Sequence, residues 1–160
     1  MTSNTLPEYE NYFKEIARTN KLIKGFVMGG ADDIISASRS DINYPALWLE
    51  IPNMVFTDNG TDQIEGQRHG AITVLKNGEY TPAQKAAVLQ ECETILLQIL
   101  GKMRKDRKAR LFSFSLHGST AEAISQLFVD NDYGWRLEFH IDKNIEVCYH
   151  AEHWDSEKTL

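Results

Sequence analysis

The chain has few of the features that mark a secreted or membrane protein. It contains two cysteines, Cys92 in a helix-like pattern and Cys148 in a strand-like pattern, and neither belongs to a C-x-x-C pair. Two such cysteines are too few for a disulfide framework, so we expect both to be reduced. No apolar run approaches the roughly 18 residues of a membrane span, and no basic segment followed by an apolar one opens the sequence. We therefore expect a cytoplasmic protein without membrane contact.

The chain also lacks a basic excess. Its 17 Lys and Arg against 23 Asp and Glu give a formal charge of −6. That charge argues against general affinity for nucleic acid or for an anionic membrane, because proteins that bind phosphate-rich surfaces usually carry a basic excess. The composition is otherwise that of a globular protein, and 160 residues predict one domain over 1–160 with a frayed tail at about 155–160.

The charge is unevenly distributed, because a single short stretch is strongly basic. Between Lys102 and Arg110 six cations stand against one acid, Asp106, which gives 6 − 1 = +5 and leaves −6 − 5 = −11 for the remainder. We predict partner binding at these cations, with a solvated helix end as the alternative. An acidic partner, a phosphate backbone or the acidic face of a second copy would fit them. The six predicted partner-binding residues are Lys102, Arg104, Lys105, Arg107, Lys108 and Arg110.

The N-terminal half shows a helix followed by short strands. Apolar residues at helical spacing predict an amphipathic helix over 7–23 that ends at Gly25. Short apolar runs then predict strands at 26–28, 34–35, 46–51, 54–57 and 67–75. Pro45 and Pro52 limit the third strand to a short or edge position. A turn signal at 58–60 joins the last two strands as a hairpin.

The helix that follows has the best-defined start in the sequence. Thr81-Pro82-Ala83-Gln84 matches the capping-box pattern, with a proline at the first helical position. From Val88 to Met103, apolar residues recur at i, i+3, i+4 and i+7 and form one stripe. The basic stretch falls at the C-terminal end of this helix, where cations meet the negative end of the helix dipole.

The C-terminal part is dominated by alternating patterns. These patterns predict a half-buried strand at 111–116, a short helix at 119–128, a strand at 135–141, and a turn at 142–144 that leads into a partner strand at 145–149. The order helix, strands, long helix, strands predicts an α+β fold. We expect a mainly antiparallel sheet covered by an N-terminal helix and a long central helix.

Several stretches contain residue types that metal binding or catalysis uses. Cys148, His150 and His153 are ligands that zinc favours, but structural zinc sites usually have four ligands and no second pair is visible. The glycines at 25–30 match no phosphate-binding motif and indicate a turn between strands. Residues 115–119, Ser-Leu-His-Gly-Ser, lack the G-x-S-x-G pattern of hydrolases. We predict no catalytic residue, metal or cofactor.

Two pairings of a histidine with an acid could supply general acid and base groups. They are His69 with Glu65, next to Arg68, and His140 with Glu138. Such coincidences are common in a chain with five histidines and 23 acids, so solvated surface groups are the preferred interpretation. The alternatives to a non-enzymatic role are a metal-binding domain or enzyme that uses the C-terminal Cys/His cluster, and a protein-binding module with an open sheet edge or groove.

The stretch from Asp130 to Ile141, DNDYGWRLEFHI, together with the order of predicted elements, resembles the tail-terminator or tail-completion proteins of tailed phages and prophages. The resemblance covers the layout of most of the chain and carries no catalytic motif. It implies a structural subunit that forms a ring, commonly a hexamer, on the tail tube and meets head-completion proteins, in the host cytoplasm or in the virion. The basic stretch would then line a lumen, in contact with DNA, or a subunit contact. No small-molecule substrate is implied.

Overall fold

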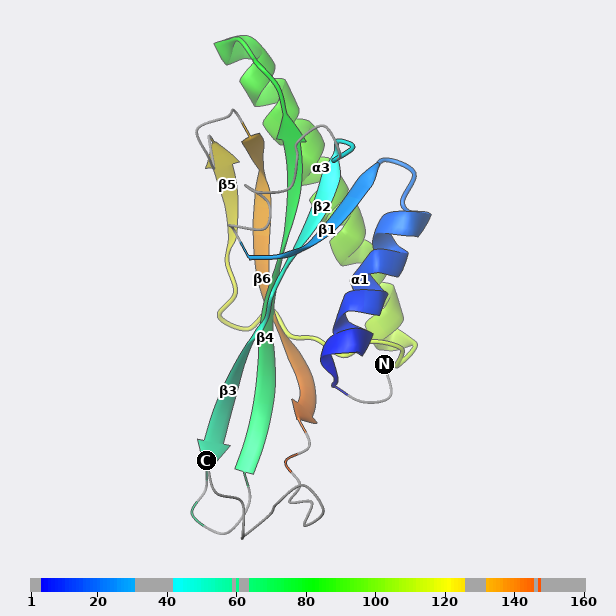
Figure 1. Ribbon diagram of the computed structural model, residues 1–160, viewed down its shortest axis with the longest axis vertical. Coiled ribbons are helices and arrows are strands. Elements are labelled where there is room, and N and C mark those ends of the chain that lie inside the picture. The colour runs from blue at the N-terminus through cyan, green and yellow to red at the C-terminus, as the bar shows by residue number, and fades with distance from the viewer. Residues whose placement is uncertain are drawn as a thin grey trace, which may run out of the picture.

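The computed structural model describes residues 4–30, 42–58, 60, 64–125, 132–145 and 147. Within these residues the chain forms two helices and a six-stranded, mostly antiparallel sheet, which confirms the predicted α+β fold. Figure 1 shows both helices packed against the twisted sheet. The elements are α1 (Leu6–Thr19), β1 (Gly25–Gly29), β2 (Ala46–Glu50), β3 (Asn53–Asp58), β4 (Ile64–Asn77), α3 (Pro82–Lys108), β5 (Ala121–Ser125) and β6 (Asp132–Ile145).

The long strand β4 organises the sheet, whose order is β1-β2-β4-β6-β5. One edge of β4 pairs with β2 over 72–75 and with β3 over 64–69, and its other edge pairs with β6. Only the β1–β2 pair is parallel among the described strands. The predicted hairpin of the segments at 54–57 and 67–75 is confirmed as β3–β4.

Strand β2 has five residues and is internal, so the short strand of the predicted alternatives is the one observed, and the edge position is not. It lies between β1 and β4. Pro45 and Pro52 both fall outside Ala46–Glu50, so no N–H of the ladder is lost to a proline ring. The two prolines bound the strand without weakening its pairing.

Helix α1 is shorter at its C-terminus than predicted. Thr5 caps its start by accepting a hydrogen bond from the Glu8 amide, and Asn20 is already extended after Thr19. Gly25 does not end this helix, because it begins β1. Its lack of a side chain is used there, since a Cβ would lie 2.4 Å from the carbonyl oxygen of Asn43.

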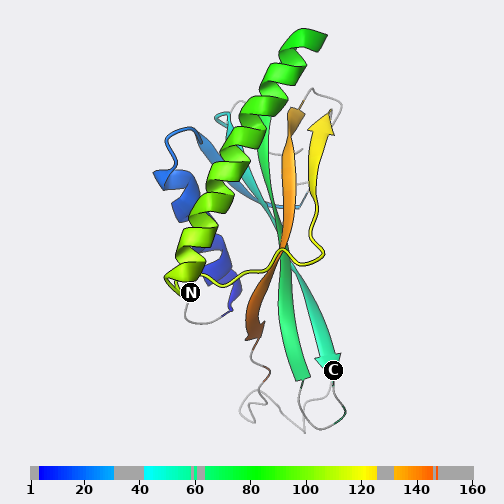
Figure 2. The same ribbon diagram turned by 180° about the vertical axis from the view of Figure 1, so that it is seen from behind.

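Helix α3 begins as predicted. Thr81 Oγ1 accepts from the Gln84 amide at 3.4 Å and Gln84 Oε1 accepts from the Thr81 amide at 2.9 Å, which completes the capping box. The apolar stripe predicted for this helix is buried. It packs with α1 against one face of the sheet in a single hydrophobic core (Figure 2). Neither described helix is long and apolar enough to cross a bilayer.

Three predictions for the C-terminal part are wrong. Residues 111–116 form no regular strand but only a bridge between Ser115 and His140, although Phe112 and Phe114 are buried as their alternation indicated. The predicted helix at 119–128 is instead strand β5 over Ala121–Ser125, paired with β6. The predicted turn at 142–144 lies within β6, which continues to Ile145 opposite Gly66.

The two faces of the sheet differ in character. The face under the helices carries the main core, which includes Leu47, Ile72 and Phe139. The opposite face has a small apolar cluster around Trp48 and Leu75 and is otherwise polar. Cys92 is buried and free, in agreement with the predicted reduced state. The predictions at 34–35, 126–131 and 148–160, including Cys148, lie outside the described residues.

Candidate functional site

The C-terminal end of α3 carries the basic stretch that the sequence indicated. All six cations from Lys102 to Arg110 are exposed, and Lys105, Arg107 and Lys108 lie in the last turn of the helix. The chain leaves the helix through Arg110, whose φ of 58° reverses its direction. Leu111 follows with its side chain 57% exposed. The stretch is therefore a basic surface with an apolar side chain at its border.

The single acid in the stretch is part of the fold and not of this surface. Asp106 is only 3% exposed, and its Oδ2 accepts a hydrogen bond of 3.0 Å from the Tyr12 hydroxyl of α1. Its Oδ1 accepts from Lys102 Nζ at 2.6 Å. Burial and the Asp106 carboxylate raise the pKa of Tyr12, so its hydroxyl keeps its proton and donates. Asp106 thus joins the two helices and neutralises one of the six cations.

The remaining cations fall into two groups. Arg107 lies 3.8 Å from an oxygen of Asp142 and 5.8 Å from the centre of the Phe114 ring. Across the described ranges, no carboxylate pairs with Arg104, Lys105, Lys108 or Arg110. These four cations of the predicted set are thus exposed and without an ion pair in the described part of the chain.

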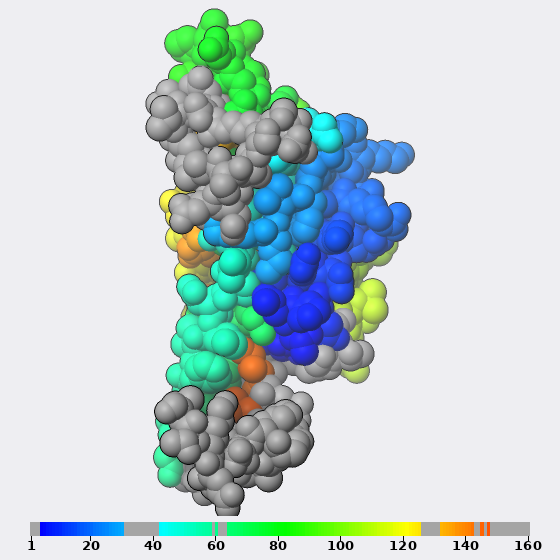
Figure 3. All heavy atoms as spheres, viewed as in Figure 1, coloured from blue at the N-terminus to red at the C-terminus, as the bar shows by residue number. Residues whose placement is uncertain are grey.

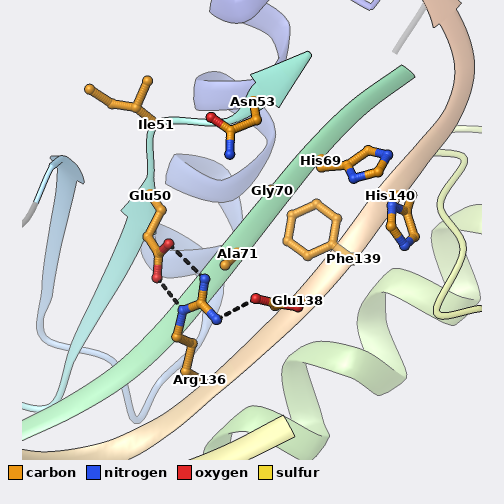
Figure 4. Close-up of a pocket in the computed structure, with 10 residues that line it drawn as sticks. All are labelled: Glu50, Ile51, Asn53, His69, Gly70, Ala71, Arg136, Glu138, Phe139 and His140. Carbon is orange, nitrogen blue, oxygen red and sulfur yellow. Dashed lines mark hydrogen bonds and ion pairs between the residues drawn. The ribbon is translucent and has the colours of Figure 1, made fainter. Parts of the chain in front are cut away.

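The polar face of the sheet carries a second candidate site. It includes His69, His140 and Glu138, which the sequence indicated as possible acid and base groups, together with Glu50 and Arg136, which it did not. A hollow of about 180 Å³ opens over β2, β4 and β6 (Figure 4). At its centre, Arg136 Nε and Nη2 donate to the two carboxylate oxygens of Glu50 at 2.6 and 2.9 Å. Nη1 donates to Glu138 at 2.6 Å, and Glu122 lies 3.9 Å away. Charge-assisted bonds raise the pKa of Arg136 further above its already high value.

Two histidines stand at the other end of this hollow. His69 and His140 are cross-strand partners, and their rings meet edge to face with centroids 4.0 Å apart. Burial and the neighbouring His140 lower the pKa of His69, while Glu138 acts in the opposite direction. His140 Nε2 lies 3.1 Å from the carbonyl oxygen of His117. The pair also lines a neighbouring hollow of about 370 Å³ with Gln67, Ser115, His117 and Asp142.

The chemistry available in the main hollow is limited. Its described lining includes acids, an arginine and two imidazoles, but no hydroxyl or thiol that could act as a nucleophile. Each of the three guanidinium nitrogens of Arg136 already donates to a carboxylate oxygen of Glu50 or Glu138. Its paired N–H groups are therefore not free to bind an anionic ligand in the bidentate manner typical of arginine. No group of three or more His, Cys, Asp or Glu within the described part of the chain is placed to hold a metal ion. The arrangement is that of an ion-pair network joining three strands.

The structure separates some candidates that are adjacent in sequence. Arg68 is buried on the helix side, where it donates to Asn4 Oδ1 at 3.2 Å and to the Asn4 carbonyl at 3.0 Å, and burial lowers its pKa. His69 faces the opposite side of β4, as strand alternation requires. Ser115 Oγ accepts a hydrogen bond of 3.1 Å from the His117 backbone amide. This is a local turn contact, and it differs from a catalytic triad, in which the serine hydroxyl pairs with an imidazole nitrogen. The C-terminal candidates Cys148, His150 and His153 lie outside the described residues.

Comparison with known proteins assigns no family, since no protein-family model and no curated protein matches the chain. Function is therefore inferred from the two surfaces themselves. Of these, the basic end of α3 has unpaired charge directed outward, whereas the polar hollow satisfies its charges internally. The basic end is the better candidate for contact with another molecule.

Proposed function

We propose that this chain is a non-enzymatic structural subunit that associates with further copies of itself into a ring. The observation that carries the proposal is the exposed basic end of α3 on a chain whose formal charge is −6. One subunit would place this end on the acidic surface of the next. Contacts between two different surfaces of identical subunits close into a ring when the rotation permits.

The biological setting that we propose is completion of a phage or prophage tail. The resemblance in layout supports it: a helix at the N-terminus, a sheet with a hairpin, a long covering helix, and a late strand that includes Gly134-Trp135. In that setting the ring would meet tail-tube and head-completion proteins. The basic end would then line either a subunit contact or a lumen that DNA passes through.

The Arg136 network is better explained as a device that fixes β2, β5 and β6 relative to one another, because Glu50, Glu122 and Glu138 come from those three strands. A rigid sheet suits a subunit that must hold its contacts in a fixed geometry.

Sedimentation velocity at low and high ionic strength tests the proposal. We expect assemblies at low salt that dissociate as salt rises, because screening shortens the reach of exposed charges from about 10 Å at 0.1 M to about 3 Å at 1 M. Lys105→Glu/Lys108→Glu should abolish assembly. The matched control Lys21→Glu/Lys24→Glu changes two exposed lysines beyond the far end of α1 and should leave assembly intact.

Two outcomes would contradict the proposal. A chain that remains monomeric at high concentration and low salt cannot be a ring subunit. If both charge variants weaken assembly equally, the effect reflects net charge and not the end of α3. Failure to bind a purified tail tube from a phage that encodes this chain would remove the tail-completion role but leave self-association in place.

A further inference from the structure

The β3–β4 hairpin extends away from the two helices. In Figures 1 and 2 the far ends of β3 and β4 continue beyond α1 and α3, and Figure 3 shows teal atoms of this part of the chain at the surface. All six residues of β3 are exposed. Met54, Val55 and Phe56 are 53%, 44% and 50% exposed, and Ile64 at the start of β4 is 48% exposed. A projection with this composition presents apolar surface to its surroundings.

Three of the four exposed apolar side chains share one face of the hairpin, and Val55 lies on the other face. In its register Met54 is opposite Arg68, Phe56 is opposite Gly66 and Asp58 is opposite Ile64, so Met54, Phe56 and Ile64 share a face. Phe56 lies across Gly66, where a Cβ would be 2.8 Å from its ring. This is the same face that α1 and α3 cover further along the sheet. On the hairpin the helices no longer cover it.

In the described part of the chain, the outer edge of β3 carries little of the usual protection, with Asp58 as its single charged residue. β3 pairs with β4 alone among the described strands. The segment Asn53–Asp58 contains no lysine, arginine or proline, the residues that commonly prevent edge strands from pairing with other chains. A flat, apolar edge of this kind is a contact surface or an aggregation hazard.

The charge at this end of the hairpin is acidic. Asp58 and Glu65 are exposed, and neither has an ion-pair partner within the described ranges. Asp58 accepts from the Gly60 amide at 2.7 Å, which holds it at the turn. The hairpin therefore combines an apolar face with two unpaired carboxylates.

The end of α3 has the complementary composition. It carries four unpaired cations with the exposed side chain of Leu111 beside them. Within one molecule, no ion pair joins Asp58 or Glu65 to this end of α3 in the described part of the chain. The described part of the chain thus offers, at two separate places, an acidic apolar surface and a basic apolar surface.

We propose that the β3–β4 hairpin of one copy docks on the C-terminal end of α3 in a second copy. Phe56 and Met54 pack near Leu111, and Asp58 on the same face meets the cations around Lys108, while Glu65 adds negative charge from the other face of the hairpin. The two surfaces differ, so the contact is head to tail and can be repeated around a ring. This inference rests on the proposed self-association and specifies the surface that receives the basic end.

A charge-swap experiment tests it with the full chain. Variant A is Asp58→Lys/Glu65→Lys, and variant B is Lys105→Glu/Lys108→Glu. In each variant alone, like charges meet at the contact, and we expect self-association to weaken by roughly tenfold or more. Mixed together, the basic hairpin of A meets the acidic helix end of B, and their unchanged surfaces also match. The mixture should form alternating assemblies that contain both variants.

The matched control for variant A is Glu10→Lys/Glu79→Lys, which makes the same charge change on α1 and before α3. It should leave self-association within about twofold of wild type, because it touches neither surface. Phe56→Ser tests the apolar part of the contact, and we expect about tenfold weaker association from loss of a half-exposed aromatic. Circular dichroism melting curves confirm that each variant is folded.

The outcomes separate this inference from the proposed function. If wild type self-associates but variant A and Phe56→Ser do not weaken it, the hairpin is not the contact surface, and ring formation through another surface stands. If variants A and B each fail to self-associate and their mixture also forms no assemblies, the proposed pairing of the hairpin with the end of α3 is wrong. A wild-type chain that stays monomeric at low salt overturns both.

Discussion

Replacing Asp106 tests whether the basic stretch is divided into a structural part and a contact part. The Tyr12 hydroxyl donates to its buried carboxylate at 3.0 Å, and hydrogen bonds to charged groups contribute about 1.5–3 kcal/mol. The pair with Lys102 adds less, about 0.2–1 kcal/mol, because the lysine side chain is 49% exposed. We therefore expect Asp106→Ala to lower the free energy of unfolding by about 3 kcal/mol. Lys102→Ala should lower it by at most about 1 kcal/mol.

A double-mutant cycle isolates the bond between α1 and α3. Tyr12→Phe removes only the hydroxyl, since the ring keeps its stack on Phe112 at 3.8 Å between centroids. We expect Tyr12→Phe and Asp106→Ala to be coupled by about 1.5 kcal/mol in urea unfolding followed by circular dichroism. The measurements belong at high salt, where self-association does not contribute to stability. Coupling below about 0.5 kcal/mol would refute the claim that Asp106 joins the helices.

Three further predictions concern other parts of the fold. Thr81→Ala removes one side of the capping box and should lower the free energy of unfolding, measured by urea titration, by about 1 kcal/mol. A change below about 0.3 kcal/mol would contradict the capping role of Thr81. Burial raises the pKa of the Cys92 thiol to about 12, so iodoacetamide at pH 8 should modify Cys92 only in the unfolded chain, as peptide mass spectrometry can show. The pKa of His69 is lowered on folding, so the unfolded chain binds its proton first as the pH falls, and the free energy of unfolding should decrease below about pH 6.5. His69→Gln should make the free energy of unfolding depend less steeply on pH in this range. Identical pH dependence in wild type and His69→Gln would contradict a lowered pKa of His69 in the folded chain.

Elements fixed by local signals were predicted well from the sequence. The start of α3 depends on Thr81 and Gln84, which are three residues apart and cap each other. The strand around Trp135 was visible from its alternation, because each side chain on a half-buried strand faces either the core or the polar side. The β3–β4 hairpin was visible for the same reason, together with its turn residues.

Elements fixed by distant partners were not predicted. Ala121–Ser125 has residues suited to a helix, yet it forms β5 because β6 offers an edge with which to pair. Residues 142–144 have the composition of a turn, yet they continue β6 because the strand still has β4 beside it as far as Gly66. In both places pairing across the sheet outweighs local preference.

The candidate surfaces show the same division. The cations at the end of α3 were evident from the sequence, but the burial of Asp106 depends on Tyr12, which lies 94 positions earlier. The Arg136 network depends on Glu50, which is 86 positions away, so no local pattern could have revealed it. An arginine on an alternating strand with acids on the same face was the only available signal.

The salt dependence of assembly also distinguishes directed association from simple aggregation through β3. An exposed apolar edge strand can pair with any similar edge, and such aggregation grows as salt screens the repulsion between chains of charge −6. Docking of the hairpin on the end of α3 depends on attraction between unlike charges, which the same screening weakens. The two processes therefore respond to salt in opposite directions. Assemblies that dissolve as salt rises would indicate the proposed contact, because screening weakens the attraction between the acidic hairpin and the basic end of α3.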